Sequence, residues 1–374
     1  MSIEAFSQPL HREDILLIQK PRIPIKHFVL YGLLPGFLKK AAYRLKGYRI
    51  GENVSLGFGS VICGKDVDIG HHSKIGFFTI VRGDQIKIGA HVSIGSMTFL
   101  DTPFIEIGDE TKINEQVFVG GLQSFDSKFV VGRNCQIMQQ CFLNPAKSIV
   151  IGDDSCIGGL SLLFGHNSWL SQFEGYDVTF EPIEIGKSVG IAWRVFVLAG
   201  VKIGDGSMIA PNSLVSHAIP PKSLAAGFPA RVISKQPDFP KEVNDAQKVD
   251  ILKNIIGEMI IYFKGSGLAV ADRGDHVEIQ KAKKSTLGGA RRTWRLIVAY
   301  EAIAPDSDPG RTGRPDVFVS LRTIPAEVRK RLNSGKVMWL DIEKKERPLF
   351  WNDLGDEVAL FIRRYGVRFY RVGT

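Results

Sequence analysis

The sequence lacks long apolar runs. No stretch approaches the roughly 18 uncharged apolar residues that a membrane-spanning helix requires. The first residues, MSIEAFSQPLHRED, also lack the basic-then-apolar build of a secretory signal. We therefore expect a cytoplasmic protein. With 374 residues, the chain is long enough for one large or two medium domains.

Cysteine is scarce, and the four cysteines form no Cys-x-x-Cys pair. The sequence therefore indicates neither a structural zinc site nor a redox centre. Cys135 and Cys141 fall where a repeat requires a small buried residue, and we interpret both as packing residues. The histidines His71, His72 and His91 stand in no motif and are expected to be ordinary surface residues.

Acidic residues are outnumbered, which gives a net charge of +9. Of this excess, +7 lies after residue 240, where 25 Lys and Arg accompany 18 Asp and Glu. The excess predicts either a solvated basic surface or a docking face for an acidic partner, a phosphorylated substrate or membrane headgroups. No RNA- or DNA-binding motif accompanies it, so nucleic acid is not an expected partner.

Glycine is abundant, with 39 copies, and many follow an isoleucine or valine at a fixed interval. Such pairs begin at Ile50, Ile69, Ile88, Ile107, Val131, Ile151, Ile185 and Ile203. Most are followed six residues later by a second aliphatic position, and the starts lie 18 to 20 residues apart except where residues are inserted. This period indicates a repeat protein in which each unit buries its apolar face against its neighbours.

Three hexapeptides make about 18 residues, one turn of a triangular coil. The aliphatic residue at position 1 points inward, and position 2 requires a small residue because a bulky one would crowd the corner. Ser, Thr, Val or Cys at position 5 fills the remaining interior. Alternation with period two would not fix a glycine every six residues, so an ordinary strand pattern is excluded. The repeat predicts an all-β parallel β-helix of about eight coils over residues 49–235.

The period breaks between Ile151 and Ile185, which lie 34 residues apart. Solenoids accept insertions at their corners, so the excess predicts an external loop of about 16 residues, roughly Asn167 to Glu181. Loops of this length are more often functional than decorative. His166 stands where the loop begins, which makes it the candidate site residue. A smaller insertion, around GLQSFDSK, follows Ile107.

The segment around this break resembles the galactoside/maltose-type hexapeptide-repeat acyltransferases. That family has Gly-His at the end of a coil, an extended loop and then Pro-Ile-x-Ile-Gly, which here are Gly165-His166 and Pro182–Gly186. The closing family motifs, IPP and AG-x-PA-[KR], appear as Ile219–Pro221 and Ala226–Arg231. The resemblance covers about residues 40–235 and implies that the β-helix is left-handed.

The resemblance implies an acetyl-CoA-dependent O-acetyltransferase that modifies a saccharide or glycan precursor, as in polysaccharide biosynthesis. His166 would be the general base that takes the hydroxyl proton, because its unperturbed pKa lies near neutrality. A backbone N–H or the side chain of Asn167 or Ser168 would stabilise the oxyanion. No cysteine lies in a nucleophile motif, so we expect direct transfer in a ternary complex.

The resemblance also assigns the binding of coenzyme A, whose arm lies along the groove between neighbouring coils in the family. Carried over by position, the cofactor residues are Trp193, Gly200, Ser216 and Arg231, and Lys235 adds a nearby charge for the same phosphate. An arginine fork suits a phosphate. Trp193 and Pro211 stand where relatives usually have small residues, which leaves the exact path of the cofactor open.

The acceptor is less defined. The Asn and Asp that bind the sugar in galactoside-type relatives align with Met138 and Ala146, so a simple galactoside or maltose acceptor is not expected. A nucleotide- or lipid-linked glycan precursor remains open. Because relatives complete the site from a neighbouring subunit, we expect a C3 homotrimer with His166 near the interface.

The two ends of the chain lie outside the repeat. The N-terminal segment, residues 1–48, ends in KHFVLYGLLPGFLKKAAYRLKGY, a helical region interrupted at Pro35. It is either a cap on the solenoid or, through residues 27–48, a peripheral membrane contact. Residues 246–374 mix predicted strands with helices near 247–263, 324–333 and 353–365, an α+β domain of unknown role.

Three alternatives remain. An N-acyltransferase of an amino sugar is not separable by sequence from an O-acyltransferase. A γ-type carbonic anhydrase shares the coil and part of its early signature at Arg82–Asp84, but it requires His ligands five residues apart, and no His-x4-His exists here. No metal is therefore predicted. A non-catalytic scaffold is disfavoured by the Gly-His, loop and Pro unit.

Overall fold

A computed structural model describes residues 24–281, 293–307, 309 and 313–373. The chain divides into two compact units, Met1–Lys241 and Glu242–Thr374. Most of the basic run KAKK and the first two residues of RRTWR lie outside the described residues, as do residues 1–23 of the predicted N-terminal segment.

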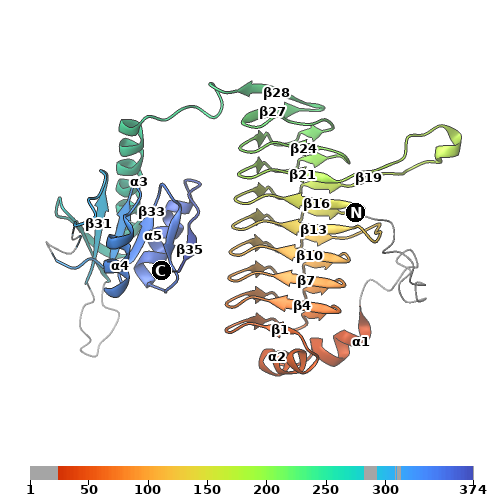
Figure 1. Ribbon diagram of the computed structural model, residues 1–374, viewed down its shortest axis with the longest axis horizontal. Coiled ribbons are helices and arrows are strands. Elements are labelled where there is room, and N and C mark those ends of the chain that lie inside the picture. Colours follow the sequence, from red (N-terminus) through yellow and green to blue (C-terminus); the bar gives the residue numbers. More distant parts are fainter. Residues whose placement is uncertain (1–23, 282–292, 308, 310–312, 374) are drawn as a thin grey trace. The chain divides into compact units, whose positions relative to one another are not determined.

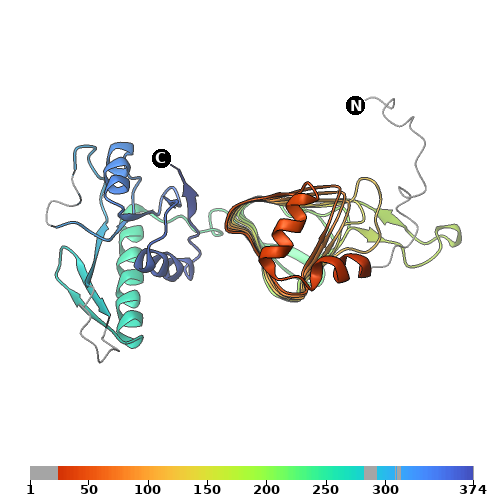
Figure 2. The ribbon, with the colours of Figure 1, turned by 90° about the horizontal axis from the view of Figure 1, so that it is seen from below.

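The first unit is a stack of coils with a triangular outline (Figure 2). The chain visits three parallel sheets in rotation. The first sheet, A, contains β1 (Arg49–Ile50), β4 (Asp66–Ile69), β7 (Gln85–Ile88), β10 (Phe104–Ile107), β13 (Lys128–Val131), β16 (Ser148–Ile151), β21 (Ile183–Ile185) and β24 (Lys202–Ile203). Sheet B contains β2 (Ser55–Leu56), β5 (Lys74–Ile75), β8 (Ser93–Ile94), β11 (Lys112–Ile113), β14 (Gln136–Ile137), β17 (Cys156–Ile157), β22 (Gly190–Ile191) and β25 (Met208–Ile209). Sheet C contains β3 (Val61–Cys63), β6 (Ile80–Arg82), β9 (Phe99–Asp101), β12 (Phe118–Val119), β15 (Phe142–Asn144), β18 (Leu162–Phe164), β23 (Phe196–Val197) and β26 (Leu214–Val215).

The register of the sheets follows the repeat. In sheet A the first aliphatic residues of successive coils pair directly, as in Ile69 with Ile88 and Ile151 with Ile185, and all of them are buried. Each coil is too small to bury these side chains alone, so stacking creates the core. The left-handed parallel β-helix that the repeat and the resemblance predicted is confirmed.

The glycine at position 2 is required by the neighbouring coil. A β-carbon on Gly51 would lie 2.6 Å from the backbone nitrogen of His71, and one on Gly70 would lie 2.5 Å from that of Ala90. Atoms cannot approach so closely, so a side chain here would force the coils apart. The crowding predicted at the corner therefore comes from the coil stacked against it.

Position 5 carries small side chains that link the coils. The Ser73 hydroxyl donates to the Gly89 carbonyl at 2.7 Å and accepts from the Val92 amide at 3.0 Å. The Cys135 and Cys141 side chains are buried at equivalent positions, and their thiols contact carbonyl oxygens at 3.1 and 3.2 Å. Both cysteines are therefore packing residues, as the sequence predicted.

Two helical segments cover the first coil (Figures 1 and 2). They are α1 (Ile25–His27), which continues as a π-helical turn (Phe28–Gly32), and α2 (Gly36–Leu45). Lys39 of α2 is fully buried and donates from Nζ to the carbonyls of Gly57 at 2.8 Å and Ser60 at 2.9 Å. Burial lowers the pKa of Lys39 to about 8. Its ammonium thus satisfies carbonyls that have no coil below them.

The other end closes with a hairpin, and the long insertion leaves the stack as an arm (Figure 1). The hairpin is β27 (Ser223–Gly227), which continues sheet B, and antiparallel β28 (Ala230–Lys235). The arm begins and ends with a two-stranded ribbon, β19 (His166–Asn167) and β20 (Thr179–Phe180), and carries a short 3-10 turn at Gln172–Glu174.

Within its described residues, the second unit has a seven-stranded mixed sheet and three helices. Its strands, in sheet order, are β29 (Leu268–Asp272), β30 (Val277–Lys281), β31 (Thr293–Ala299), β32 (Val317–Ser320), β33 (Met338–Asp341), β34 (Glu346–Pro348) and β35 (Tyr370–Val372). The helices are α3 (Asp245–Gly265), α4 (Ala326–Ser334) and α5 (Asp353–Arg363). Asn244 and Gln247 form a capping box that starts α3. The short strands β29, β30 and β34 were not predicted from the sequence.

Candidate active site

His166 lies at the corner where sheet C turns toward sheet A. β18 brings the chain to this corner, Gly165 donates its amide to the Asn144 carbonyl of the coil below at 2.9 Å, and β19 then leads into the arm. The smaller insertion, which the sequence singled out after Ile107, leaves the same corner two coils earlier. Both breaks in the repeat therefore meet at one edge of the β-helix.

Both imidazole nitrogens of His166 have a partner. The side-chain amide nitrogen of Asn144 lies 2.8 Å from Nε2, and the Ser168 hydroxyl lies 3.1 Å from Nδ1. In this orientation of the Asn144 amide its NH2 group donates to Nε2, and Nδ1 then carries the proton that it donates to Ser168. This tautomer presents a lone pair at Nε2, the atom that a general base needs.

Aromatic rings surround the imidazole. The ring centroids of Phe164, Trp169 and Phe180 lie 5.9, 6.0 and 6.0 Å from that of His166. Burial among them lowers the pKa of His166 below its ordinary value. The imidazole is thus neutral at neutral pH, which keeps its lone pair available.

Asn144 is the site residue that the sequence analysis missed. It ends β15 directly beneath Phe164, is almost fully buried, and packs where a β-carbon on Gly121 would come within 2.7 Å of its side-chain oxygen. Within the described part of the chain this Oδ1 has no hydrogen-bond partner. A polar residue at the end of a third face, one coil before Gly165-His166, was the signal that could have identified it.

The predicted oxyanion residues are both engaged in other contacts. The Asn167 side chain donates to the Asp177 carbonyl across the arm at 3.2 Å. The Ser168 hydroxyl is the partner of His166 Nδ1. Ser168 thus contacts the imidazole, and Asn167 links the two ends of the arm.

The predicted cofactor residues fall on different parts of the β-helix. Gly200 and Ser216 lie on the next two coils at the His166 corner, because β18, β23 and β26 pair in register. Trp193 follows β22 at the corner between sheets B and C, where its ring packs over Gly159. Gly200 and Ser216 therefore lie near His166, whereas Trp193 lies on another edge of the β-helix.

Arg231 and Lys235 both lie on β28 but have partners on opposite faces of the hairpin. Arg231 is opposite Ala226 and Lys235 is opposite the buried Ser223, with a register shift between these pairs. Ser223 and Ala226 alternate between core and surface, so the shift separates the two cations. Arg231 is exposed, and its guanidinium donates to the Ala230 carbonyl at 3.2 Å.

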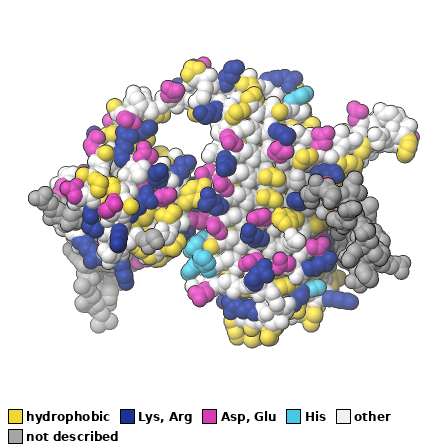
Figure 3. Space-filling model, in the orientation of Figure 1, with side chains coloured by type: hydrophobic (Ala, Val, Ile, Leu, Met, Phe, Trp, Pro, Cys, Tyr) yellow, Lys and Arg dark blue, Asp and Glu magenta, His cyan; other side chains and the backbone are white. Residues whose placement is uncertain are grey.

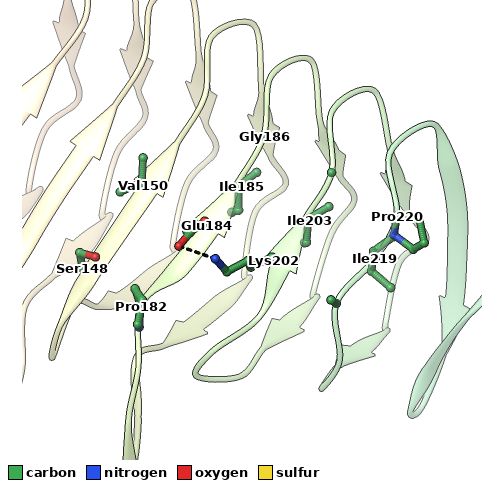
Figure 4. A pocket seen from close by; sticks show the side chains of 12 residues that line it. Ser148, Val150, Pro182, Glu184, Ile185, Gly186, Lys202, Ile203, Ile219 and Pro220 are labelled. Carbon is green, nitrogen blue, oxygen red and sulfur yellow. Dashed lines mark ion pairs between the residues drawn. The ribbon is translucent and has the colours of Figure 1, made fainter.

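A groove of about 650 Å³ crosses sheet A beside the His166 corner (Figure 4). Its lining comes from β16, β21, β24 and the turn before the hairpin, namely Ser148, Val150, Pro182, Glu184, Ile185, Gly186, Lys202, Ile203, Gly204, Ala218, Ile219 and Pro220. Glu184 and Lys202 form an ion pair of 3.1 Å within it. Pro182 follows the arm, and Lys202 and Ala218 each lie two residues after a predicted cofactor residue.

The places aligned with the sugar-binding residues of relatives also separate. Met138 follows β14 at the corner between sheets B and C, away from the His166 corner. Ala146 is buried at the His166 corner, where its carbonyl accepts from the Ser127 hydroxyl at 2.9 Å. Asn144 rather than Met138 is the neighbour of His166.

Residues 24–281, 293–307, 309 and 313–373 contain no group of three His, Cys, Asp or Glu side chains placed to hold a metal ion. Over the same residues, no helix is long and apolar enough to cross a membrane.

No protein-family model matches the chain. Over 127 residues it is 33% identical to the galactoside O-acetyltransferase of Escherichia coli strain K12, which covers 33% of this chain and 59% of that protein. Over 74 residues it is 46% identical to a putative acetyltransferase of Staphylococcus aureus strain Mu50, which covers 19% of this chain and 37% of that protein. The chain thus spans less than two thirds of either curated relative.

Among solved structures, a hexapeptide-repeat acetyltransferase of Vibrio cholerae aligns with 56% of this chain and 86% of its own, at 20% identity and a TM-score of 0.29. The family resemblance therefore depends on the sequence matches to the two curated relatives. They confirm the resemblance to galactoside-type hexapeptide-repeat acetyltransferases that the motifs around His166 predicted.

Proposed function

We propose that this protein is an acetyl-CoA-dependent O-acetyltransferase that modifies a saccharide or glycan precursor, with His166 as the general base. The observation that carries the proposal is the hydrogen bonding of the His166 imidazole. Its ring is held at both nitrogens by Asn144 and Ser168, and its lone pair at Nε2 faces a polar partner. The similarity to the galactoside O-acetyltransferase of Escherichia coli supports the same chemistry.

In the proposed reaction, an acceptor hydroxyl displaces the Asn144 amide and donates its hydrogen bond to Nε2. The hydroxyl oxygen attacks the thioester carbonyl of acetyl-CoA while its proton passes to Nε2. The tetrahedral intermediate then breaks its carbon–sulfur bond, and the imidazolium returns the proton to the leaving thiolate of coenzyme A. Ser168 accepts from Nδ1 throughout, so the ring keeps its orientation.

Asn144 has a second part in this proposal. Its Oδ1 is buried and has no partner in the described part of the chain, a state that costs free energy unless a ligand fills it. A neighbouring hydroxyl of a saccharide would donate to it. Asn144 would thereby position the acceptor at the base.

We place the apolar arm of the donor in the groove on sheet A. The groove is largely lined by apolar residues and lies beside the His166 corner, next to Gly200 and Ser216. The exposed Arg231 suits the phosphates at the far end of coenzyme A. Lys235, on the other face of the hairpin, is the less suitable anchor.

We also propose that a second copy of the chain covers the arm, in a homotrimer. Several apolar side chains of the arm are exposed, and the Phe173 side chain has no cover at all in the isolated chain. Apolar surface of this kind is typical of an interface. A trimer would place a neighbouring subunit beside His166.

The proposal is tested by titrating acetyl-CoA into the purified protein in a calorimeter and then assaying release of free coenzyme A thiol with a panel of saccharides. We expect binding that weakens in Arg231→Ala and stays unchanged in the matched variant Lys235→Ala. Absence of binding by acetyl-CoA and by longer acyl-CoA thioesters would rule out an acyltransferase. Turnover with amino sugars alone would instead identify an N-acyltransferase.

A further inference from the structure

The helical cap at the start of the β-helix exposes an apolar surface that the proposed chemistry does not use. Its exposed side chains share the outer surface of α1, the π-helical turn and α2, and each is between 45% and 90% exposed. They are Ile25, Val29, Leu30, Leu33, Phe37, Leu38 and Leu45. Soluble proteins rarely leave so many large apolar side chains together on one surface without a partner.

The apolar surface continues onto the first three coils. Phe58, Phe77, Phe78 and Met97 are all at least half exposed and lie at the corner between sheets B and C. This corner adjoins the cap, because the Gly59 amide donates to the Gly32 carbonyl at 2.9 Å. We call these eleven side chains the cap patch.

The charges on the helical part of the cap patch have one sign. Residues 24–51 contain six Lys and Arg and no Asp or Glu. Lys39 is buried and Arg49 pairs with Asp66 and Asp68, which leaves Lys26, Lys40, Arg44 and Lys46 beside the apolar surface. Figure 3 shows apolar side chains with Lys and Arg among them at this end of the β-helix.

We propose that the cap patch binds an anionic lipid surface, so that the protein docks on a membrane by the first coil of its β-helix. Apolar side chains enter the boundary between headgroups and acyl chains, and basic side chains contact the anionic headgroups. A second copy of the chain would fit less well, because the helical parts of two facing cap patches would bring eight cations together, with no Asp or Glu within residues 24–51 of either copy. Charge complementarity therefore selects the lipid surface.

The experiment is flotation of the full-length protein with vesicles of phosphatidylcholine alone or of phosphatidylcholine mixed with phosphatidylglycerol. We expect binding to the anionic vesicles that weakens as salt is raised. The double variant Leu30→Asp/Phe37→Asp should lower the bound fraction by at least about tenfold, because two charges enter the apolar contact. Ile261→Asp in α3 is the matched control, since Ile261 is equally exposed but lies outside the patch.

Each outcome decides the proposal. Binding to anionic vesicles that is lost in the double variant and kept in Ile261→Asp supports it. No binding to either vesicle overturns it, as does binding that neither salt nor the double variant changes. If the double variant instead lowers the mass of the assembly in light scattering, a second copy covers the patch and the proposal is wrong. None of these results depends on acyl transfer, so the proposed activity is tested separately.

Discussion

Asn144 lies one coil below His166, and its side-chain amide nitrogen is 2.8 Å from the imidazole Nε2. The two residues are 22 positions apart, and the pairing of β15 with β18 brings them together. Because Asn144 can only donate to Nε2 from its NH2 group, this contact selects the tautomer with a free lone pair at Nε2. The stack of coils therefore sets the tautomer of the proposed base.

Changing Asn144 to Asp should shift the pH dependence of the enzyme. A carboxylate beside the imidazole favours the imidazolium, so the pKa of His166 rises and the acid limb of kcat/KM moves to higher pH. Asn144→Ala removes the donor without adding charge and should lower kcat/KM with no comparable shift of the limb. The measurement is the pH profile of all three proteins. Equal profiles for the Asp and Ala variants would contradict the direct contact.

The activity of the wild type should persist to lower pH than it would with a general-base histidine of ordinary pKa. Burial lowers the pKa of His166 below 6.5, and the base works only when neutral, so kcat/KM should fall with a midpoint below pH 6.5 as pH decreases. NMR titration of the imidazole, assigned with His166→Asn, gives the same pKa without an acceptor. His166→Ala should lose about 10²- to 10⁴-fold in kcat while acetyl-CoA binding is kept. A midpoint above 6.5 would count against a desolvated base.

The repeat made most of the fold predictable. Position 1 stacks and position 2 must be small for steric reasons that act between adjacent coils, so a one-dimensional period specifies the three-dimensional stack. His166 was identifiable because it interrupts that period. Asn144 was not identified, since its role depends on which residue of the previous coil lies beneath the break, and the alignment with relatives had pointed to Met138 instead.

The positions of the predicted cofactor residues in the coil could not be obtained from the sequence alone. Trp193 and Ser216 carry similar family support in the sequence, yet they lie on different corners of the triangle. A shift of about six residues, one hexapeptide, moves a side chain to the next corner, and alignment of so regular a repeat does not resolve such a shift. Similarly, a register shift in β28 separates Arg231 from Lys235. No residue of that strand predicts this shift from the sequence.

A large side chain in the groove on sheet A should weaken the binding of acetyl-CoA and leave His166 unchanged. Ala218 is exposed and lines the groove, so Ala218→Phe is expected to fold normally and to raise the KM for acetyl-CoA by at least about tenfold, through lost contact and steric exclusion. Trp193→Ala serves as the comparison, because it lies on another corner and should leave that KM unchanged. The opposite result would place the donor at the Trp193 corner.

The arm should determine the oligomeric state. If a neighbouring subunit covers its apolar tip, the wild-type protein will have about three times the chain mass of 41.4 kDa in light scattering. Phe173→Asp would then shift the mass toward the monomer, because a buried charge opposes association. Glu174→Gln, next in sequence, should keep the trimer. A monomeric wild type would leave the arm without a neighbour and contradict the trimer.

Lys39 should contribute more to the free energy of unfolding than its neighbour Lys40. Lys39→Met takes from the Ser60 carbonyl its Lys39 donor at the closed end and leaves the Gly57 carbonyl with only the Ser60 amide and hydroxyl, which should cost about 2 kcal/mol in the free energy of unfolding, whereas Lys40→Met should change little. Burial lowers the pKa of Lys39 to about 8 in the folded protein, while the unfolded chain keeps its proton to about pH 10.5. Between these values the unfolded state binds more protons, so the stability of the wild type relative to Lys39→Met should rise with pH. Urea denaturation at pH 7, 8 and 9.5 measures both effects, and a difference that shrinks with rising pH would show that the ammonium is not desolvated.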